Sequence, residues 1–373
     1  MWMVINLLEK ALELLKIFEN NGYEAYLVGG FVRDYILKRA SVDVDICTNA
    51  TPKEIQEIFK NVRLPFEQYG AVHLMYKKVN FEITTYRMDL EYGNGRRPSR
   101  IMYTDKLSID LKRRDFTMNT LCMSSKRKII NMFNGLDDIK KRVIRMVGEP
   151  DKKLKEDPLR ILRAIRFATE LNFKIDDKLK KAIIKNREEL NNLSYFRKKD
   201  ELNKIFASPN ANLGISLIKK YGLSKYLGIN VNKKVVNTND PIGIWAQVFP
   251  DSNYQFTSNE KDYIKAILRV LRDKSINDME LYREGNYVCY IAAQILGINA
   301  TNIYDRCDAL PIKKTSDIKI NGKDIIELLN PKDKTIIKNI MKDIEEKIIE
   351  RKLVNESEEL KKYILNNYSK NVL

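Results

Sequence analysis

The hydrophobic pattern of the chain changes once, and this change limits the possible folds more than any other feature. From about residue 24 to 135, short β-type runs such as EAYLVGG, VDVDICT and AVHLMYKKVNFEITTYR alternate with helical segments. From about residue 139 onward the pattern is almost wholly helical. We therefore predict an α+β fold, in which an N-terminal head with a small mixed β-sheet of about five strands is followed by helices only.

Turn residues divide the chain further. Ser208 and Pro209 interrupt the helical pattern and mark a joint. The segment from Tyr86 to Ser108 is polar, rich in Gly and Arg and without a clear period, which predicts a mobile loop. We expect four domains, namely a head at 1–138, a helical neck at 139–209, a helical body at 210–275 and a helical tail at 276–373.

The charge balance indicates the kind of partner. The chain has 373 residues, with 67 Lys and Arg against 50 Asp and Glu, so its formal net charge at pH 7 is +17. Because 44% of the residues are hydrophobic, the chain also has enough apolar material for a globular core. A basic surface on a globular protein suits a polyanion, and nucleic acid is the first to consider. The alternative is that the lysines cover solvated helix faces and bind nothing.

Histidine and cysteine usage excludes several kinds of site. The chain has one histidine, His73, which excludes a metal site with two histidines. Cys47, Cys122, Cys289 and Cys307 lie far apart and form no CxxC pair, so neither a zinc knuckle nor a disulfide framework is supported. No apolar run approaches the ~20 residues that span a bilayer, and the start of the chain lacks a signal-peptide cleavage site. We expect a cytoplasmic protein with no membrane segment.

Two acids in VDVDI form the first candidate site. Asp43 and Asp45 are two apart in a β-type run, so we expect both carboxylates on one face of a strand. Neighbouring carboxylates repel each other unless a divalent cation neutralises them, and hard oxygen ligands favour magnesium. The alternative is an edge strand with two solvated acids.

A glycine turn precedes these acids. Gly29 and Gly30 end a β-type run and FVRD opens a helix, so backbone amides of this turn can approach an anion, with Arg33 to pair with it. A phosphate-binding turn beside a pair of acids is what a nucleoside triphosphate and its metal require.

A third constellation lies in EDPLRILRAIRF. Pro158 fits the first helical position, which makes Asp157 a natural N-cap. Arg160, Arg163 and Arg166 then recur every three residues on one side of the helix, where like charges repel unless an anion lies opposite. The pattern favours a phosphate-rich ligand, with a solvated basic face as the alternative.

Together these stretches resemble a known family. LVGGFVRD followed by DVDI is similar to the nucleotidyltransferase signature of the polymerase-β superfamily, in the form found in class II tRNA nucleotidyltransferases and bacterial poly(A) polymerases. DLKRRDFTMNTL at 110–121 resembles the second motif of that family, and EDPLRILRAIRF at 156–167 resembles its base-selecting motif. ING followed by KDIIELL, from residue 320, resembles the tail of the bacterial CCA-adding branch.

The resemblance implies roles for individual residues. Arg114 would bind nucleotide and Asp115 would hold the ribose 2′-hydroxyl, with a structural ion pair between the two as the alternative. Asp157 and Arg160 would choose the base, and the chemistry agrees. Cytosine and adenine both present an amine donor beside a ring-nitrogen acceptor, which a carboxylate beside a guanidinium complements, whereas uracil and guanine present the reverse order.

The predicted function is template-independent addition of CCA to the 3′ end of tRNA from CTP and ATP. The primer 3′-hydroxyl would attack the α-phosphate in line, with two Mg²⁺ ions on Asp43 and Asp45, and pyrophosphate would leave. The head would be catalytic, the neck would select the base, and the basic helices would hold the acceptor end and elbow of tRNA, with no DNA partner expected.

Three alternatives remain open. Poly(A) polymerase and an enzyme that adds only the terminal A share the fold. A non-catalytic RNA-binding protein is less favoured, because the chain keeps the acids and arginines of the motifs. Within the site, Glu82 could be a third acid at the metal, and Phe196 stands where many family members carry an acid next to the arginine, here Arg197. The oligomeric state cannot be predicted from the sequence.

Overall fold

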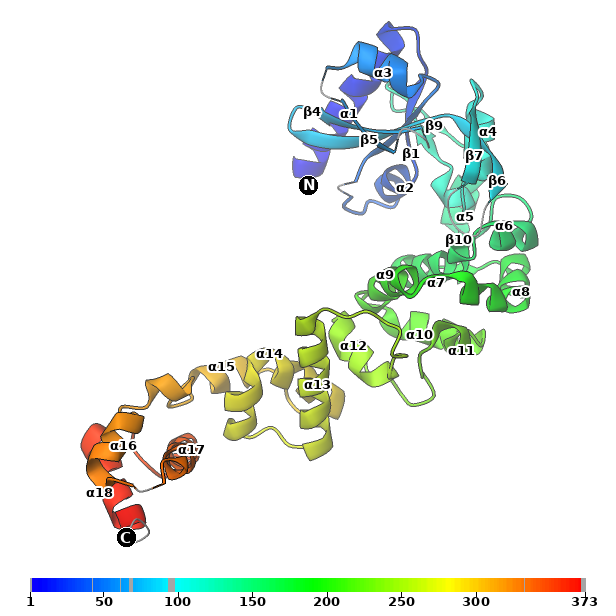
Figure 1. Ribbon diagram of the computed structural model, residues 1–373. Helices are drawn as coiled ribbons and strands as arrows, with labels where there is room; N and C mark the ends of the chain where they lie inside the picture. The colour runs from blue at the N-terminus through cyan, green and yellow to red at the C-terminus, as the bar shows by residue number, and fades with distance from the viewer. Residues whose placement is uncertain are drawn as a thin grey trace. The chain divides into compact units, whose positions relative to one another are not determined.

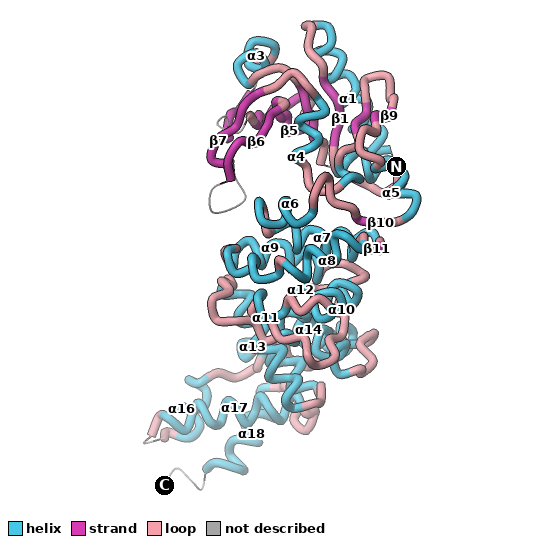
Figure 2. The backbone as a smooth tube through the Cα atoms, turned by 90° about the vertical axis from the view of Figure 1, so that its right-hand side faces the viewer, coloured by secondary structure: helices cyan, strands magenta, loops and turns pink. Residues whose placement is uncertain are grey.

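The structure has the α+β organisation that the sequence predicts. The computed structural model describes residues 2–41, 43–60, 62–66, 70–92, 98–331 and 333–369. Strands gather in the N-terminal part of the chain, drawn blue to cyan in Figure 1, and helices predominate from residue 135 onward. The tube in Figure 2 shows the same separation by colour. The fold class predicted from the pattern change is therefore confirmed.

The head is built on a mixed sheet. Its strand order is β3-β4-β5-β2-β1-β8-β9, and β2 runs parallel to β5 while the other pairs are antiparallel. The strands are β1 (Ala25–Val28), β2 (Asp45–Thr48), β3 (Val62–Phe66), β4 (Ala71–Tyr76), β5 (Val79–Thr85), β8 (Cys122–Met123) and β9 (Ile129–Ile130).

The sheet has seven strands, so the expectation of about five was too low. The strands β8 and β9 are two residues long each, which is too short for an alternating pattern to reveal them. They form because Cys122 and Met123 pair with both β1 and β9. Long-range pairing, which is invisible in a local window, determines these two strands.

The prediction of a mobile loop between Tyr86 and Ser108 is wrong for most of that segment. β6 (Arg87–Tyr92) and β7 (Pro98–Tyr103) form a separate antiparallel two-stranded sheet with irregular register, followed by α4 (Leu107–Arg113). The register shifts explain why no alternation is visible in the sequence. Residues 93–97 lie outside the described residues.

Local signals in the sequence place the first helices. α1 (Trp2–Asn20) packs against β1 through buried residues such as Leu14, Leu15 and Phe18. α3 (Pro52–Ile58) begins at a capping box, in which the Thr51 side chain accepts from the Glu54 N–H and the Glu54 carboxylate accepts from the Thr51 N–H.

The helical part continues to the end of the described chain. A short parallel pair, β10 (Val143–Ile144) and β11 (Lys174–Ile175), lies within it, so the region after the head is mostly helical and the expectation of helices only is corrected here. The helices are α2 (Gly30–Ile36), α5 (Gly135–Lys141), α6 (Pro150–Glu156), α7 (Leu159–Leu171), α8 (Asp177–Lys185), α9 (Tyr195–Phe206), α10 (Ala211–Lys220), α11 (Ser224–Leu227), α12 (Pro241–Val248), α13 (Ser258–Asp273), α14 (Asp278–Leu296), α15 (Ile303–Asp308), α16 (Gly322–Leu329), α17 (Thr335–Ile349) and α18 (Ser357–Tyr368).

The chain forms two compact units. Unit 1 comprises Met1–Lys233 with Asp251–Tyr254, and unit 2 comprises Lys234–Pro250 with Gln255–Leu373. The division into head, neck, body and tail stays a prediction. In the part of the chain that the structure describes, no helix has the length and apolar character needed to cross a bilayer. A cytoplasmic location also stays a prediction.

Candidate active site

A polar cavity of about 850 Å³ opens inside unit 1, between the sheet and α7. Its size is in the range that holds a small organic ligand. The ten residues predicted for the site all line it, namely Gly30, Arg33, Asp43, Asp45, Arg114, Asp115, Asp157, Arg160, Arg163 and Arg166. Motifs from three separate stretches of sequence therefore meet in one place.

The glycine turn forms one wall of the cavity. β1 ends at Val28, and Gly29 has a φ of 79°, a conformation that L side chains rarely adopt. A Cβ atom at Gly29 would lie 3.5 Å from Arg114 Nη1 and 3.6 Å from Asp45 Oδ2. The absence of a side chain lets the backbone of this turn approach both the arginine and the acid.

Asp45 and Asp43 do not share a strand as predicted. β2 begins at Asp45, which is half-buried, whereas Asp43 precedes the strand and is exposed. Asp45 pairs with Val28 of β1 and with Glu82 of β5, which is its direct partner in the parallel pair of β2 and β5. Burial, then Glu82, raises the pKa of Asp45 to about 6, with Asp43 adding to the shift and Arg114 opposing it.

These acids are the residues that could hold a cation. Asp43, Asp45 and Glu82 all line the cavity, and carboxylate oxygens are the donors that magnesium prefers. Within the described ranges, however, no three His, Cys, Asp or Glu side chains lie close enough together to form a metal site. Burial and the neighbouring Glu82 raise the pKa of Asp45 more than Arg114 lowers it.

Arg114 is held by an acid that the sequence reasoning did not identify. Its Nη2 lies 3.4 Å from Oδ2 of Asp110, which is fully buried and also binds Arg113. Burial would lower the pKa of Arg114, but Asp110 and other nearby groups raise it. Its Nε is buried and donates to no atom of the described residues. The spacing of three and four residues from Asp110 to Arg113, the last residue of α4, and to Arg114, which follows it, was the available signal.

Asp115 belongs to a different network. Arg163 Nε lies 2.7 Å from Oδ2 of Asp115, and the Asn119 side-chain amide donates to Oδ1 at 3.0 Å. Burial would raise the pKa of Asp115, but Arg163, Asn119 and the Phe116 N–H together lower it to about 2. An ion pair between Arg114 and Asp115, the structural alternative considered from the sequence, is therefore not formed.

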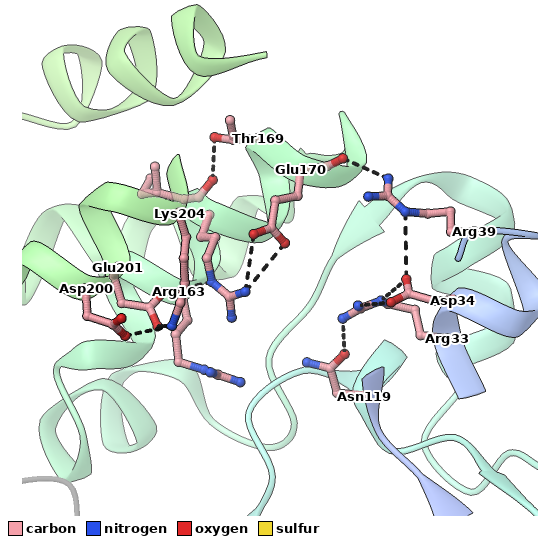
Figure 3. A network of polar contacts seen from close by, with 12 residues as sticks. Arg33, Asp34, Arg39, Asn119, Arg163, Thr169, Glu170, Asp200, Glu201 and Lys204 are labelled. Carbon is pink, nitrogen blue, oxygen red and sulfur yellow. Dashed lines mark hydrogen bonds and ion pairs between the residues drawn. The ribbon is translucent and has the colours of Figure 1, made fainter. Parts of the chain in front are cut away.

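Asn119 links this network to the helix after the glycine turn. Its Oδ1 accepts from Arg33 Nη1 at 2.9 Å while its amide donates to Asp115. Arg33 also makes a two-point ion pair with Asp34, at 3.0 and 2.8 Å. Figure 3 shows the Arg33 side chain between Asp34 and Asn119. Asn119 thus connects an arginine of α2 to the acid that Arg163 of α7 binds.

The reason for expecting an anion opposite the three arginines of α7 is not upheld. Arg163 pairs with Asp115, and Arg166 Nε lies 2.8 Å from Oε2 of the buried Glu201. Arg160 donates to two backbone carbonyls, those of Lys153 and Arg113, and lies 3.4 Å from the Glu156 carboxylate. Internal acids and carbonyls compensate the repulsion, so the repeat by itself does not require a ligand.

Asp157 lies two residues before the start of α7, so it does not occupy the N-cap position that the sequence predicted. α7 begins at Leu159 with Pro158 before it. Asp157 Oδ1 accepts from the Leu159 N–H at 3.2 Å and from Arg197 at 3.2 Å. The acid is buried and lines the cavity, so it caps the first turn and faces a ligand site at the same time.

Arg197 and Phe167 also belong to the site, whereas Phe196 does not. Arg197, on α9, orients Asp157, so the arginine next to the unusual Phe196 does support the site. Phe196 itself is 78% exposed and does not belong to the cavity lining. Phe167, which the sequence reasoning passed over, is buried and lines the cavity. Its position directly after Arg166, the last arginine of the repeat, was the only feature of the sequence that indicated a place in the site.

Comparison with known proteins explains this arrangement. The Poly A polymerase head domain model matches residues 25–145, and the model of a probable RNA and SrmB-binding site of polymerase A matches 172–229. The tRNA nucleotidyltransferase domain 2 model matches 252–364. The CCA-adding enzyme of Staphylococcus epidermidis is 31% identical over 95% of this chain and 97% of its own length. The chain belongs to the family of CCA-adding enzymes and poly(A) polymerases.

Further members of the family agree in sequence and in fold. The CCA-adding enzyme of Lactobacillus johnsonii is 34% identical over 84% of this chain and 86% of its own length. The solved structure of the Bacillus stearothermophilus CCA-adding enzyme in complex with CTP is 28% identical, with a TM-score of 0.86 over 97% of this chain and 98% of that chain. Nucleotidyltransferases of this family are typically metal-dependent.

Proposed function

We propose that this protein adds C, C and A to the 3′ end of tRNA from CTP and ATP, without a template. The observation that carries the proposal is the single cavity in which the glycine turn, the acids Asp43 and Asp45, and the pair Asp157 and Arg160 meet. The full-length similarity to CCA-adding enzymes supports the choice of tRNA as the primer. The match of residues 252–364 to a tRNA nucleotidyltransferase model supports it too.

The residues of the cavity have separate tasks in this proposal. The backbone of Gly30 and the guanidinium groups of Arg33 and Arg114 bind the triphosphate, and Nε of Arg114 has a donor to offer. Asp115 stays ionised because its pKa is about 2, and it accepts from the ribose 2′-hydroxyl. The primer 3′-hydroxyl then attacks the α-phosphate in line, the bond to the β-phosphate oxygen breaks, and pyrophosphate leaves.

Base choice is assigned to Asp157 and Arg160. In this proposal Asp157 accepts from the exocyclic amine of cytosine or adenine, while Arg197 keeps the carboxylate in place. Arg160 donates to the adjacent ring nitrogen after it exchanges one of its carbonyl partners, Lys153 or Arg113, for the base. Base recognition then depends on the positions of α6 and α4, because Lys153 lies on α6 and Arg113 lies on α4.

Magnesium is the metal that this donor set suits. Asp43 and Asp45 would hold it, and when bound it would activate the attacking oxygen and stabilise the leaving pyrophosphate. The proximity of Glu82 to Asp45 makes Glu82 the third acid to test. We further propose that the head at 1–138 is catalytic, that the neck at 139–209 selects the base, and that the helical tail at 276–373 binds tRNA.

A primer series tests the proposal. We expect a tRNA transcript that lacks CCA to gain two residues from CTP alone and all three from CTP with ATP in magnesium. Asp43→Ala and Asp45→Ala should fold normally and incorporate nothing, and turnover within about tenfold of wild type would remove them from the site.

The same series separates the alternatives. An enzyme that adds only the terminal A would use ATP on a transcript ending in CC and would ignore CTP. A poly(A) polymerase, favoured by the description of the head model, would extend an oligo(A) primer with ATP repeatedly. A protein that binds tRNA and incorporates neither nucleotide on any primer would be a non-catalytic RNA-binding protein.

A further inference from the structure

One aromatic ring in the cavity contacts three of its arginines. The Phe167 ring centroid lies 5.0 Å from Cζ of Arg33, 5.3 Å from Cζ of Arg163 and 4.2 Å from Cζ of Arg166. Phe167 is 4% exposed and lines the cavity, as do all three arginines. A guanidinium within about 6 Å of an aromatic ring centroid is attracted by the electron-rich face of the ring.

Within the described residues no single acid pairs with all three guanidinium groups, although Asn119 links Arg33 to the Asp115 that Arg163 binds. Arg33 pairs with Asp34, Arg163 pairs with Asp115, and Arg166 pairs with Glu201 and Glu170. Each of these acids holds one of the three arginines from its own side. The ring is a contact that all three arginines share, and it attracts each guanidinium in addition to the acid that pairs with it.

The ring also joins two parts of the site that are far apart in the sequence. Arg33 lies on α2, directly after the glycine turn, whereas Arg163 and Arg166 lie on α7. Phe116 meets the ring of Phe167 edge-on, with centroids 5.6 Å apart and an interplanar angle of 85°, and is itself fully buried. This contact fixes the plane of the ring and hence the direction in which its faces point.

We propose that Phe167 is a positioning residue that holds the guanidinium groups of Arg33, Arg163 and Arg166 as one cluster for the phosphates of the nucleotide. The proposal rests on the proposed function, because the nucleoside triphosphate is the anion that the cluster binds. An aliphatic side chain of similar size fills the same space but has no electron-rich face. Without that face the guanidinium groups separate, and the cluster binds the nucleotide less tightly in the ground state and the transition state alike.

The first test compares two phenylalanines. We expect Phe167→Leu to raise KM for CTP and ATP about tenfold and to change kcat less than about threefold, because uniform binding is lost. Phe173→Leu is the matched control. Phe173 is 5% exposed and lies six residues further on, with Arg142 Cζ at 5.3 Å from its ring, but it does not belong to the cavity lining. Phe173→Leu should lose similar thermal stability and keep the wild-type KM.

A second test weakens the negative charge on the face of the ring while it keeps the shape of the side chain. Phenylalanines with one, two and three ring fluorines, introduced at position 167 by nonsense suppression, withdraw electron density from the face step by step. We expect log KM to rise with each fluorine, and unsubstituted phenylalanine introduced in the same way should restore the wild-type value. This series decides the question even if Phe167→Leu does not fold.

Distinct outcomes overturn the two claims. A KM that stays flat across the fluorine series, or an equal rise in Phe173→Leu and Phe167→Leu, removes Phe167 from the positioning role and leaves it as core packing. If the wild-type protein incorporates neither CTP nor ATP on any tRNA primer, the proposed function fails. The affinity for CTP, measured by calorimetry across the same series, then decides whether Phe167 holds an anion-binding cluster.

Discussion

Replacing Asp45 by asparagine should stabilise the metal-free protein while it abolishes nucleotide transfer. The side chain is half-buried, and burial together with Glu82 raises its pKa from the usual 3.8 to about 6. A raised carboxyl pKa means that the folded state binds the proton more tightly than the unfolded state does. Its contribution to stability is therefore present below about pH 4 and is lost as the pH rises through about 6.

The size of the effect follows from the shift. About two pKa units at 1.36 kcal/mol each set an upper bound of about 3 kcal/mol, and partial exposure of the side chain reduces this to about 1–2 kcal/mol. For a unit of this size, about 1 kcal/mol corresponds to about 2–4 °C in Tm. We expect Asp45→Asn to unfold several degrees above wild type at pH 7.5 in EDTA, and the difference should vanish near pH 4.

Asp110→Asn is the matched control with the opposite sign. Burial would raise the pKa of Asp110, but Arg113 and Arg114 outweigh it and lower the pKa. Its stabilising contribution is present above about pH 4 and is lost as the pH falls further, so the asparagine variant should have a lower Tm than wild type at pH 7.5. The reasoning is refuted if Asp45→Asn also lowers Tm at pH 7.5, or if its gain is as large at pH 4 as at pH 7.5.

Three further changes test other parts of the site. Asn119→Ala removes one hydrogen bond from Arg33, which keeps Asp34, and one from Asp115, which keeps Arg163. It should destabilise the protein by about 1–3 kcal/mol in urea unfolding, whereas a loss below about 0.5 kcal/mol would mean that water replaces the amide. Asp157→Ala should raise kcat/KM for UTP or GTP relative to CTP and ATP. If kcat/KM falls equally for all four nucleotides, the role of Asp157 is limited to its capping hydrogen bond with the Leu159 N–H. The affinity for tRNA should fall steeply between about 50 and 200 mM salt in a filter-binding assay, because a protein with a net charge of +17 releases counterions from the RNA on binding. An affinity that does not change with salt would mean that the basic surface is not the RNA-binding surface.

Much of the architecture was readable from local sequence. The change from mixed to helical periodicity placed the sheet before residue 139, and the α+β fold follows from it. The start of α3 depends on local residues only, Thr51, Pro52 and Glu54, because a capping box satisfies backbone groups within a single turn. The ten residues predicted for the site all line one cavity, although Asp43 and Asp45 do not share the strand that their spacing predicted, and their roles stay predictions.

Strand pairing was decided only by the tertiary structure. The strands β8 and β9 form because other strands lie beside them, and the register shifts of the β6–β7 hairpin erase the alternation that a sequence window detects. Glu82 became the neighbour of Asp45 through the parallel pairing of β5 with β2, which joins strands that are not consecutive in the chain.

The sequence by itself identified nine of the charged residues that line the cavity, whereas Asp34, Arg87, Asp89 and Arg113 also line it and were not predicted. The tertiary structure decided which of these residues pair. Arg114 and Asp115 are adjacent in the chain, yet Asp115 binds Arg163, 48 residues away, and Arg114 binds Asp110. The physical reason is the distance along the chain over which each effect acts. Helical and strand periodicity act over a few residues and set the direction of a side chain, whereas the partner of a buried charge depends on which elements pack around it. The place of Phe167 among three arginines from α2 and α7 is a contact of this second kind.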